Sequence, residues 1–238
     1  MSNINEQLKN LYAKYCDKAG KAYKSQNAKI SSPLLIKIDE EAYANAKKRV
    51  MIFGQETYGW HGKFGSKEID FLMCDYFMLL SENEKYFDNS IRSKKRLQKK
   101  RKGRPFWKGI RFFENGLKDS YIVWNNISKV GKMKGTGTNA KIRKFEREYF
   151  KGIINEEIRI LKPDIIIFFG WSGYKNVKDK FDIDSKIEHK DENGFKFSEI
   201  KFQSLECKAV RLYHPASYRY GKVFDQTKDE ALKILNTT

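Results

Sequence analysis

The sequence has few cysteines, few prolines and no long hydrophobic run. Its 238 residues include three Cys and four Pro. Three widely spaced cysteines (Cys16, Cys74 and Cys207) are too few for a four-thiolate zinc site or iron–sulfur cluster, so we expect free thiols and no cluster. No segment has the roughly 20 apolar residues of a membrane span. The first residues also lack a signal-peptide pattern. We therefore expect a cytoplasmic protein with no membrane partner.

Positive charge is abundant and unevenly distributed. The chain carries 48 Lys and Arg against 30 Asp and Glu, a formal net charge of +18. Residues 89–150 hold 19 of the basic residues and only 4 acidic ones. A field of one sign repels itself, which favours a polyanionic partner, and nucleic acid is the leading candidate. A solvated basic loop is the alternative. The densest segment contains Arg92, Lys94, Lys95, Arg96, Lys99, Lys100, Arg101, Lys102 and Arg104.

The composition is that of a folded protein in spite of this charge. Hydrophobic residues make up 40% of the chain and aromatic residues 14%, enough for a packed core. The length suits one domain. We expect a single monomeric domain over 1–238, with an N-terminal helical extension over about 1–48 and a basic insertion over about 89–108.

Apolar patterning predicts an α/β fold. Helical spacing is seen over 7–23, 40–48 and 141–161. Continuous rather than alternating apolar runs are typical of strands buried on both faces, as in parallel sheets. The pair Asn193-Gly194 predicts a hairpin over 186–203. We expect helices on both sides of a mainly parallel four-stranded sheet, plus a small hairpin excursion. The four predicted strands are Arg49–Phe53, Tyr121–Trp124, Ile165–Phe169 and Ala209–Tyr213.

Polar motifs follow three of these strands. Gly54-Gln55-Glu56-Thr57-Tyr58 comes after the first, Asn125-Asn126 ends the second, and His214-Pro215-Ala216-Ser217-Tyr218 comes after the fourth. The carboxyl ends of strands in an open α/β sheet are where ligands bind. We therefore expect a carboxylate, an amide and an imidazole to share one cleft.

These motifs resemble those of the uracil-DNA glycosylase superfamily. Gly54–Tyr58 is similar to the family pattern Gly-Gln-Asp-Pro-Tyr, Ile122–Asn125 to its apolar strand ending in Asn, and His214–Tyr218 to His-Pro-Ser-Pro-Leu. The order is that of the family, over about residues 49–222. The resemblance implies the family's three-layer sandwich and a monofunctional DNA glycosylase. Such an enzyme flips out a base and hydrolyses its N-glycosidic bond, with no cofactor and no metal.

The resemblance assigns roles to individual residues. Glu56 stabilises the sugar cation and positions water, and His214 stabilises the departing base. Asn125, or its neighbour Asn126, reads the edge of the flipped base. The remaining substrate contacts are Gln55 through its backbone, Tyr58 near the base C5, and Phe64 or Phe71 as a stacking ring.

A wedge into the DNA stack is expected from Ser217, Tyr218 and Arg219. Three departures from the family pattern stand out: Glu56 replaces Asp, Thr57 replaces Pro, and Ala216-Ser217-Tyr218 replaces the usual wedge. They leave the excised base open between uracil and a modified pyrimidine such as the glucosylated 5-hydroxymethylcytosine of phage DNA. Repair and antiviral defence are both open as roles.

Two other functions fit parts of the sequence. Pro163-Asp164 followed by Glu199-Ile200-Lys201 resembles the PD-(D/E)xK pattern of metal-dependent nucleases, although the 35-residue gap is long. A non-catalytic nucleic-acid-binding module would need only the basic segment.

Overall fold

The computed structural model divides into two compact units. Unit 1 comprises Met1–Glu41, Gln55–Ser81 and Asn125–Lys162, and unit 2 comprises Ala42–Gly54, Glu82–Trp124 and Pro163–Thr238. The structure describes residues 3–23, 29–56, 59–80, 103–135, 137–170, 174–190, 192, 194–216 and 221–237. Residues 89–102 of the basic insertion lie outside them. Within the described ranges, no helix is both long and apolar enough to cross a membrane.

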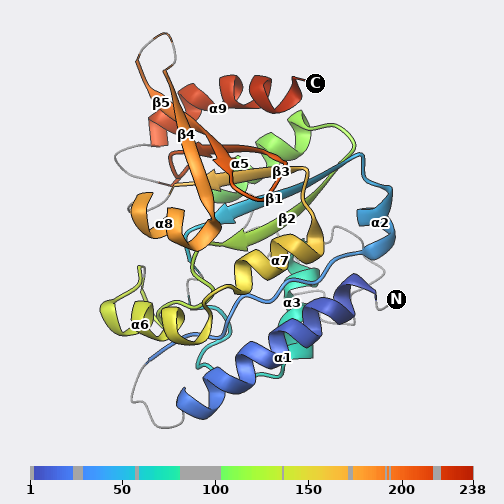
Figure 1. Ribbon diagram of the computed structural model, residues 1–238, viewed down its shortest axis with the longest axis vertical. Coiled ribbons are helices and arrows are strands. Elements are labelled where there is room, and N and C mark those ends of the chain that lie inside the picture. The colour runs from blue at the N-terminus through green and yellow to red at the C-terminus, as the bar shows by residue number, and fades with distance from the viewer. Residues whose placement is uncertain are drawn as a thin grey trace. The chain divides into compact units, whose positions relative to one another are not determined.

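Unit 2 is built on a mixed β-sheet, drawn in Figure 1. Its described strands have the order β2-β1-β3-β6-β5-β4. The central strands β1, β3 and β6 are parallel, and β5 and β4 extend the sheet in antiparallel pairing. The strand bounds are β1 Lys48–Gly54, β2 Ser120–Asn126, β3 Ile165–Phe169, β4 Ile183–Lys190, β5 Lys196–Phe202 and β6 Lys208–Leu212.

The α/β class is confirmed, and so are the positions of the four predicted strands. The four-stranded, mainly parallel sheet is wrong: the sheet has six described strands and is mixed. The predicted hairpin exists as β4 and β5, but it is not a separate excursion. Its second strand pairs with β6 at Glu199 and Val210, so the hairpin enlarges the sheet.

Consecutive phenylalanines of β3 show how helices cover both faces of the sheet. Side chains of a strand alternate between faces. Phe168 contacts Phe181 of α8 (Tyr174–Phe181), with ring centroids 5.0 Å apart. Phe169 contacts Phe113 of α5 (Pro105–Gly116) and Phe224 of α9 (Gly221–Asn236). Unit 2 is therefore a helix–sheet–helix sandwich, as its continuous apolar strands predicted.

Unit 1 is mainly helical. Its helices are α1 Ile4–Tyr23, α3 Ile69–Leu80, α6 Ala140–Tyr149 and α7 Ile153–Leu161. The single helix predicted over 141–161 is in fact two, because Gly152 adopts φ +86° between α6 and α7. Glycine takes this left-handed conformation without steric cost. The helix predicted over 40–48 ends early: α2 spans Glu40–Asn45, and Lys48 already begins β1.

A network of buried charges lies in the interior of unit 1. The Lys129 ammonium is 2.7 Å from Glu157 Oε1, and neither side chain is exposed. Tyr12 donates its hydroxyl to the same carboxylate at 2.8 Å, and burial raises the Tyr12 pKa well above its usual value. Asn125 donates Nδ2 to Glu157 Oε2 at 2.9 Å and accepts from Lys129 at 3.1 Å. Each charge is thus compensated by an opposite charge and by further hydrogen bonds.

This network joins segments distant in sequence. Its side chains come from α1, the end of β2, the following loop and α7. The Tyr12 hydroxyl also accepts the Ile36 amide, and the Lys129 amide donates to Glu146 of α6. The fold of unit 1 therefore depends on side chains whose charges have no access to water.

We predict that Lys129→Met strongly destabilises unit 1, because it leaves the Glu157 carboxylate buried without its cation. Breaking such a pair typically costs about 3–5 kcal/mol. The free energy of unfolding in urea measures the loss. Lys233→Met is the control, since it removes an exposed partner of Glu230 and is expected to leave the urea midpoint near wild type. Equal midpoints for the two variants would contradict the role of the network.

Candidate functional site

In unit 1, the Glu56 carboxylate is held in place by backbone groups. It lies two residues beyond the end of β1, and the preceding Gln55 accepts the Ser128 amide at 2.9 Å through its carbonyl. Glu56 itself is half-buried, and its Oε1 accepts the Gly137 amide. Its Oε2 is buried and has no hydrogen-bond partner among the described residues. A fixed carboxylate with one unused oxygen can stabilise a nearby cation or accept a proton from water.

Two opposing influences act on the ionisation of Glu56. Burial raises the pKa of Glu56 above the usual glutamate value. The Gly137 hydrogen bond and the positive charge of Lys132 lower the same pKa, because both stabilise the ionised form. Lys132 and Gly137 belong to one lysine- and glycine-rich loop. No site residue was predicted in this loop from the sequence. The loop therefore favours the ionised form of a carboxylate whose pKa is raised by burial.

In unit 2, His214 is held as a neutral imidazole with one defined donor. It follows the end of β6 by two residues. The Ala216 amide donates to its Nδ1 at 3.1 Å, so Nδ1 carries no proton and the neutral ring has its hydrogen on Nε2. Burial lowers the pKa of His214 below the usual 6.5. The imidazole therefore presents an Nε2–H donor without a positive charge at neutral pH.

An aromatic cluster supports the His214 ring. Phe106, near the start of α5, stacks on it with a centroid separation of 5.6 Å and an interplanar angle of 17°. Phe106 also contacts Trp124 and Phe169. Phe106 was not predicted as a site residue from the sequence, although Pro105 indicates a helix start immediately before it. This packing fixes the plane of the imidazole.

Two of the expected base-binding residues have other roles. Asn125 is fully buried, and its amide oxygen and nitrogen are both used in the Lys129–Glu157 network. Phe64 is 4% exposed and packs against Tyr23, Phe145 and Phe150. In this structure Asn125 orients the network and Phe64 belongs to the core of unit 1, and their roles in base recognition stay predictions.

Phe71 is the one of the two proposed stacking rings that faces solvent. It is 44% exposed, and the Lys67 ammonium lies 4.8 Å from its ring centroid. Its other neighbour is the His61 ring, which is hydrogen-bonded to Asp75 at 2.7 Å. A partly exposed aromatic ring beside a positive charge is a combination that can stack a base next to its phosphate.

Several predicted DNA contacts fall on residues whose placement is not described. These are Tyr58, the wedge Ser217, Tyr218 and Arg219, and the basic residues from Arg92 to Lys102. Arg104 is described: it is exposed and occupies the N-cap position of α5.

The carboxylates of the alternative nuclease motif are used in other pairs. Arg49 forms hydrogen bonds to both Asp164 oxygens and lowers the pKa of that carboxyl. Glu199 lies across the hairpin from His189, at 3.4 Å. Asp164 precedes β3 whereas Glu199 opposes Val210 inside β6. Nowhere in the described ranges do three or more His, Cys, Asp or Glu side chains gather in a way that could hold a metal ion.

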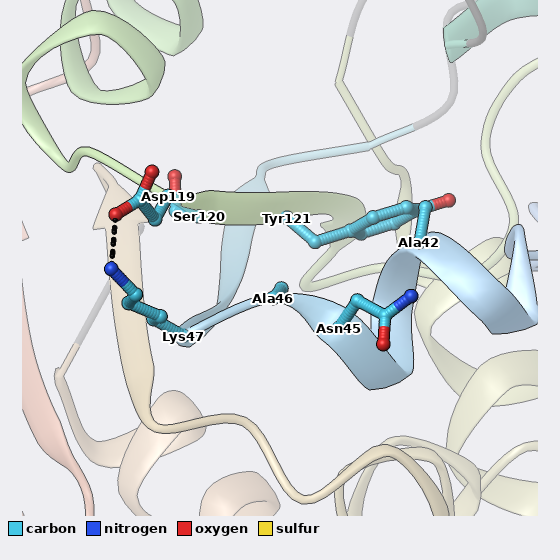
Figure 2. Close-up of a pocket in the computed structure, with 7 residues that line it drawn as sticks. All are labelled: Ala42, Asn45, Ala46, Lys47, Asp119, Ser120 and Tyr121. Carbon is cyan, nitrogen blue, oxygen red and sulfur yellow. Dashed lines mark hydrogen bonds and ion pairs between the residues drawn. The ribbon is translucent and has the colours of Figure 1, made fainter.

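Figure 2 shows a pocket of unit 2. Lys47 and Asp119 form an ion pair of 2.8 Å at its rim. The pocket lies where β1 and β2 begin, whereas His214 follows the end of β6, which runs parallel to β1 through β3. The pocket and His214 therefore lie at opposite ends of the parallel strands. The pocket is lined by Ala42, Asn45, Ala46, Lys47, Asp119, Ser120 and Tyr121.

No protein-family model matches the sequence, and no curated protein matches it. The functional assignment therefore depends on the chemistry of the residues described above.

We predict that His214 is neutral at pH 7 and carries its proton on Nε2. The ¹⁵N resonances of labelled histidine distinguish protonated from unprotonated ring nitrogens, and His214→Asn assigns the signal. We expect an unprotonated Nδ1 and a midpoint below 6.5, because burial disfavours the charged ring. A protonated Nδ1 at pH 7, or a midpoint above 6.5, would contradict this description.

Proposed function

We propose that this protein is a monofunctional DNA N-glycosylase, which hydrolyses the bond between deoxyribose and a uracil or modified pyrimidine and leaves an abasic site. The observation that carries the proposal is the state of His214: a neutral, stacked imidazole whose Nδ1 is occupied by a backbone amide. The motif resemblance supports it independently. We further propose that the protein acts as a cytoplasmic monomer without metal or cofactor.

The reaction needs stabilisation of two opposite charges. When the C1′–N bond breaks, its electron pair leaves with the base and the sugar becomes cationic. In the proposal, His214 Nε2–H hydrogen-bonds the base oxygen as it becomes negative. One such preorganised donor is typically worth about 3 kcal/mol in the transition state. Burial favours the neutral ring, and the neutral ring still donates through Nε2–H.

Glu56 has the complementary role at the sugar. Its ionised carboxylate stabilises the cationic C1′, to which water then adds, and accepts the proton that this water loses. Its Oε2 makes no hydrogen bond among the described residues, so none is lost when the carboxylate takes this role. No amine nucleophile is assigned to the reaction, so we expect hydrolysis rather than cleavage of the DNA strand.

The test is an alkali-cleavage assay in EDTA with three DNA duplexes. One contains uracil, one contains glucosylated 5-hydroxymethylcytosine and one contains only normal bases. We expect alkali-dependent breaks in one of the modified duplexes, which would also identify the base. Glu56→Gln, nearly isosteric but uncharged, is expected to slow release by about 10²- to 10⁴-fold with unchanged DNA affinity. Full activity in this variant would overturn the role of Glu56.

The same assay separates the alternatives. Strand cleavage that needs Mg²⁺ but no alkali would overturn the glycosylase proposal in favour of a nuclease. DNA binding with no cleavage of any of the three duplexes, with or without Mg²⁺, would count against it in favour of a binding module.

The Lys132 charge gives a prediction for the pH profile of base release. It lowers the Glu56 pKa, so Lys132→Met should raise that pKa. Because the ionised carboxylate is the active form, the acid limb should move to higher pH, with little change in rate well above it. Lys134→Met is the matched control, since it removes the same charge from an exposed position of the same loop. An equal shift in both variants would contradict a specific effect on Glu56.

A further inference from the structure

We propose that the outward face of α6 is a second contact for the DNA backbone, separate from the basic segment 92–104. The four basic residues of α6, namely Lys141, Arg143, Lys144 and Arg147, are all exposed. Its core-facing residues are Ile142, Phe145 and Glu146. With 3.6 residues per turn, Arg143, Lys144 and Arg147 share the opposite side of the helix, and Lys141 flanks it in the first turn. Glu148 is the exposed acidic residue of α6.

Several lysines elsewhere on the described surface are paired with carboxylates. In α9, Lys233 pairs with Glu230 and Lys228 with Asp225. Lys47 and Lys196 likewise have carboxylate partners. Among the described residues, by contrast, Lys141, Lys144 and Arg147 form no salt bridge. A net positive field of four basic side chains against one exposed acidic residue favours a polyanion, since binding it releases condensed counterions.

The buried side of α6 distinguishes nucleic acid from a membrane surface. A helix that inserts into a lipid interface needs an exposed apolar face beside its basic one. The large apolar side chains of α6 instead belong to the unit 1 core: Ile142 is 2% and Phe145 is 1% exposed. Only charged side chains remain for a partner, so the surface fits phosphates.

The position of α6 in the chain relates this surface to Glu56. Asn139 caps the helix by accepting the Ile142 amide at 2.9 Å. Gly137, which donates to Glu56, lies two residues before that cap. Phosphates bound along α6 would therefore lie on the same unit as the carboxylate. The inference rests on the proposed function only in taking DNA as the polyanion.

The test is the salt dependence of binding to a duplex of normal bases. A triple variant carries Lys141→Ala, Lys144→Ala and Arg147→Ala, and alanine preserves the exposed helix. Each phosphate contact contributes about 0.9 to the slope of log K against log salt. We expect the slope to become shallower by about 2 to 3. The control carries Lys47→Ala, Lys196→Ala and Lys233→Ala, which remove the same charge from ion-paired sites, and should leave the slope unchanged.

Three results would overturn the inference. The first is an unchanged slope in the α6 variant, and the second is an equal change in both variants. The third is an α6 variant that binds DNA like the wild type but binds anionic lipid vesicles less well. Circular dichroism checks that both variants are folded. Because the duplex contains no base to excise, the slope is measured whether or not the protein is a glycosylase. The two proposals can therefore fail separately.

Discussion

The ion pair between Lys129 and Glu157 is the constraint on which unit 1 depends. Neither charge reaches solvent, so each must be satisfied within the fold, and Tyr12 and Asn125 complete the arrangement. The residue before Lys129, Ser128, donates its amide to Gln55, which directly precedes Glu56. The buried pair thus fixes the loop that holds the start of the Glu56 segment. One backbone hydrogen bond therefore links the segment that carries Lys129 to the segment that carries Glu56.

Much of the fold could be predicted because local patterns encode it. Four continuous apolar runs corresponded to β1, β2, β3 and β6, and the hairpin predicted over 186–203 corresponded to β4 and β5. The place of that hairpin could not be predicted, since its pairing with β6 is a long-range contact that no local pattern specifies. The break at Gly152 was missed because charged and apolar residues keep helical spacing on both sides of it.

Candidate site residues could be predicted where a sequence motif includes them. The burial of a side chain could not be predicted, because it depends on the folded structure. Glu56 and His214 follow strand ends, and their surroundings suit the assigned chemistry. Asn125 and Phe64 have the residue types of base-binding groups, but burial turned both to the interior. No sequence pattern distinguishes Lys129 and Glu157 from the charged residues of the surface. Only the fold brings them together, and only then do Phe106, Lys132 and Gly137 acquire a role.

The most direct test of the account is to identify the products formed in H₂¹⁸O with EDTA present. A glycosylase would release the free base and an equal amount of abasic DNA, with ¹⁸O at the sugar C1′, and Glu56→Gln would release little of either. Mass spectrometry of the base and the DNA measures both products. Strand fragments without free base, or ¹⁸O on a phosphate, would contradict the central claim.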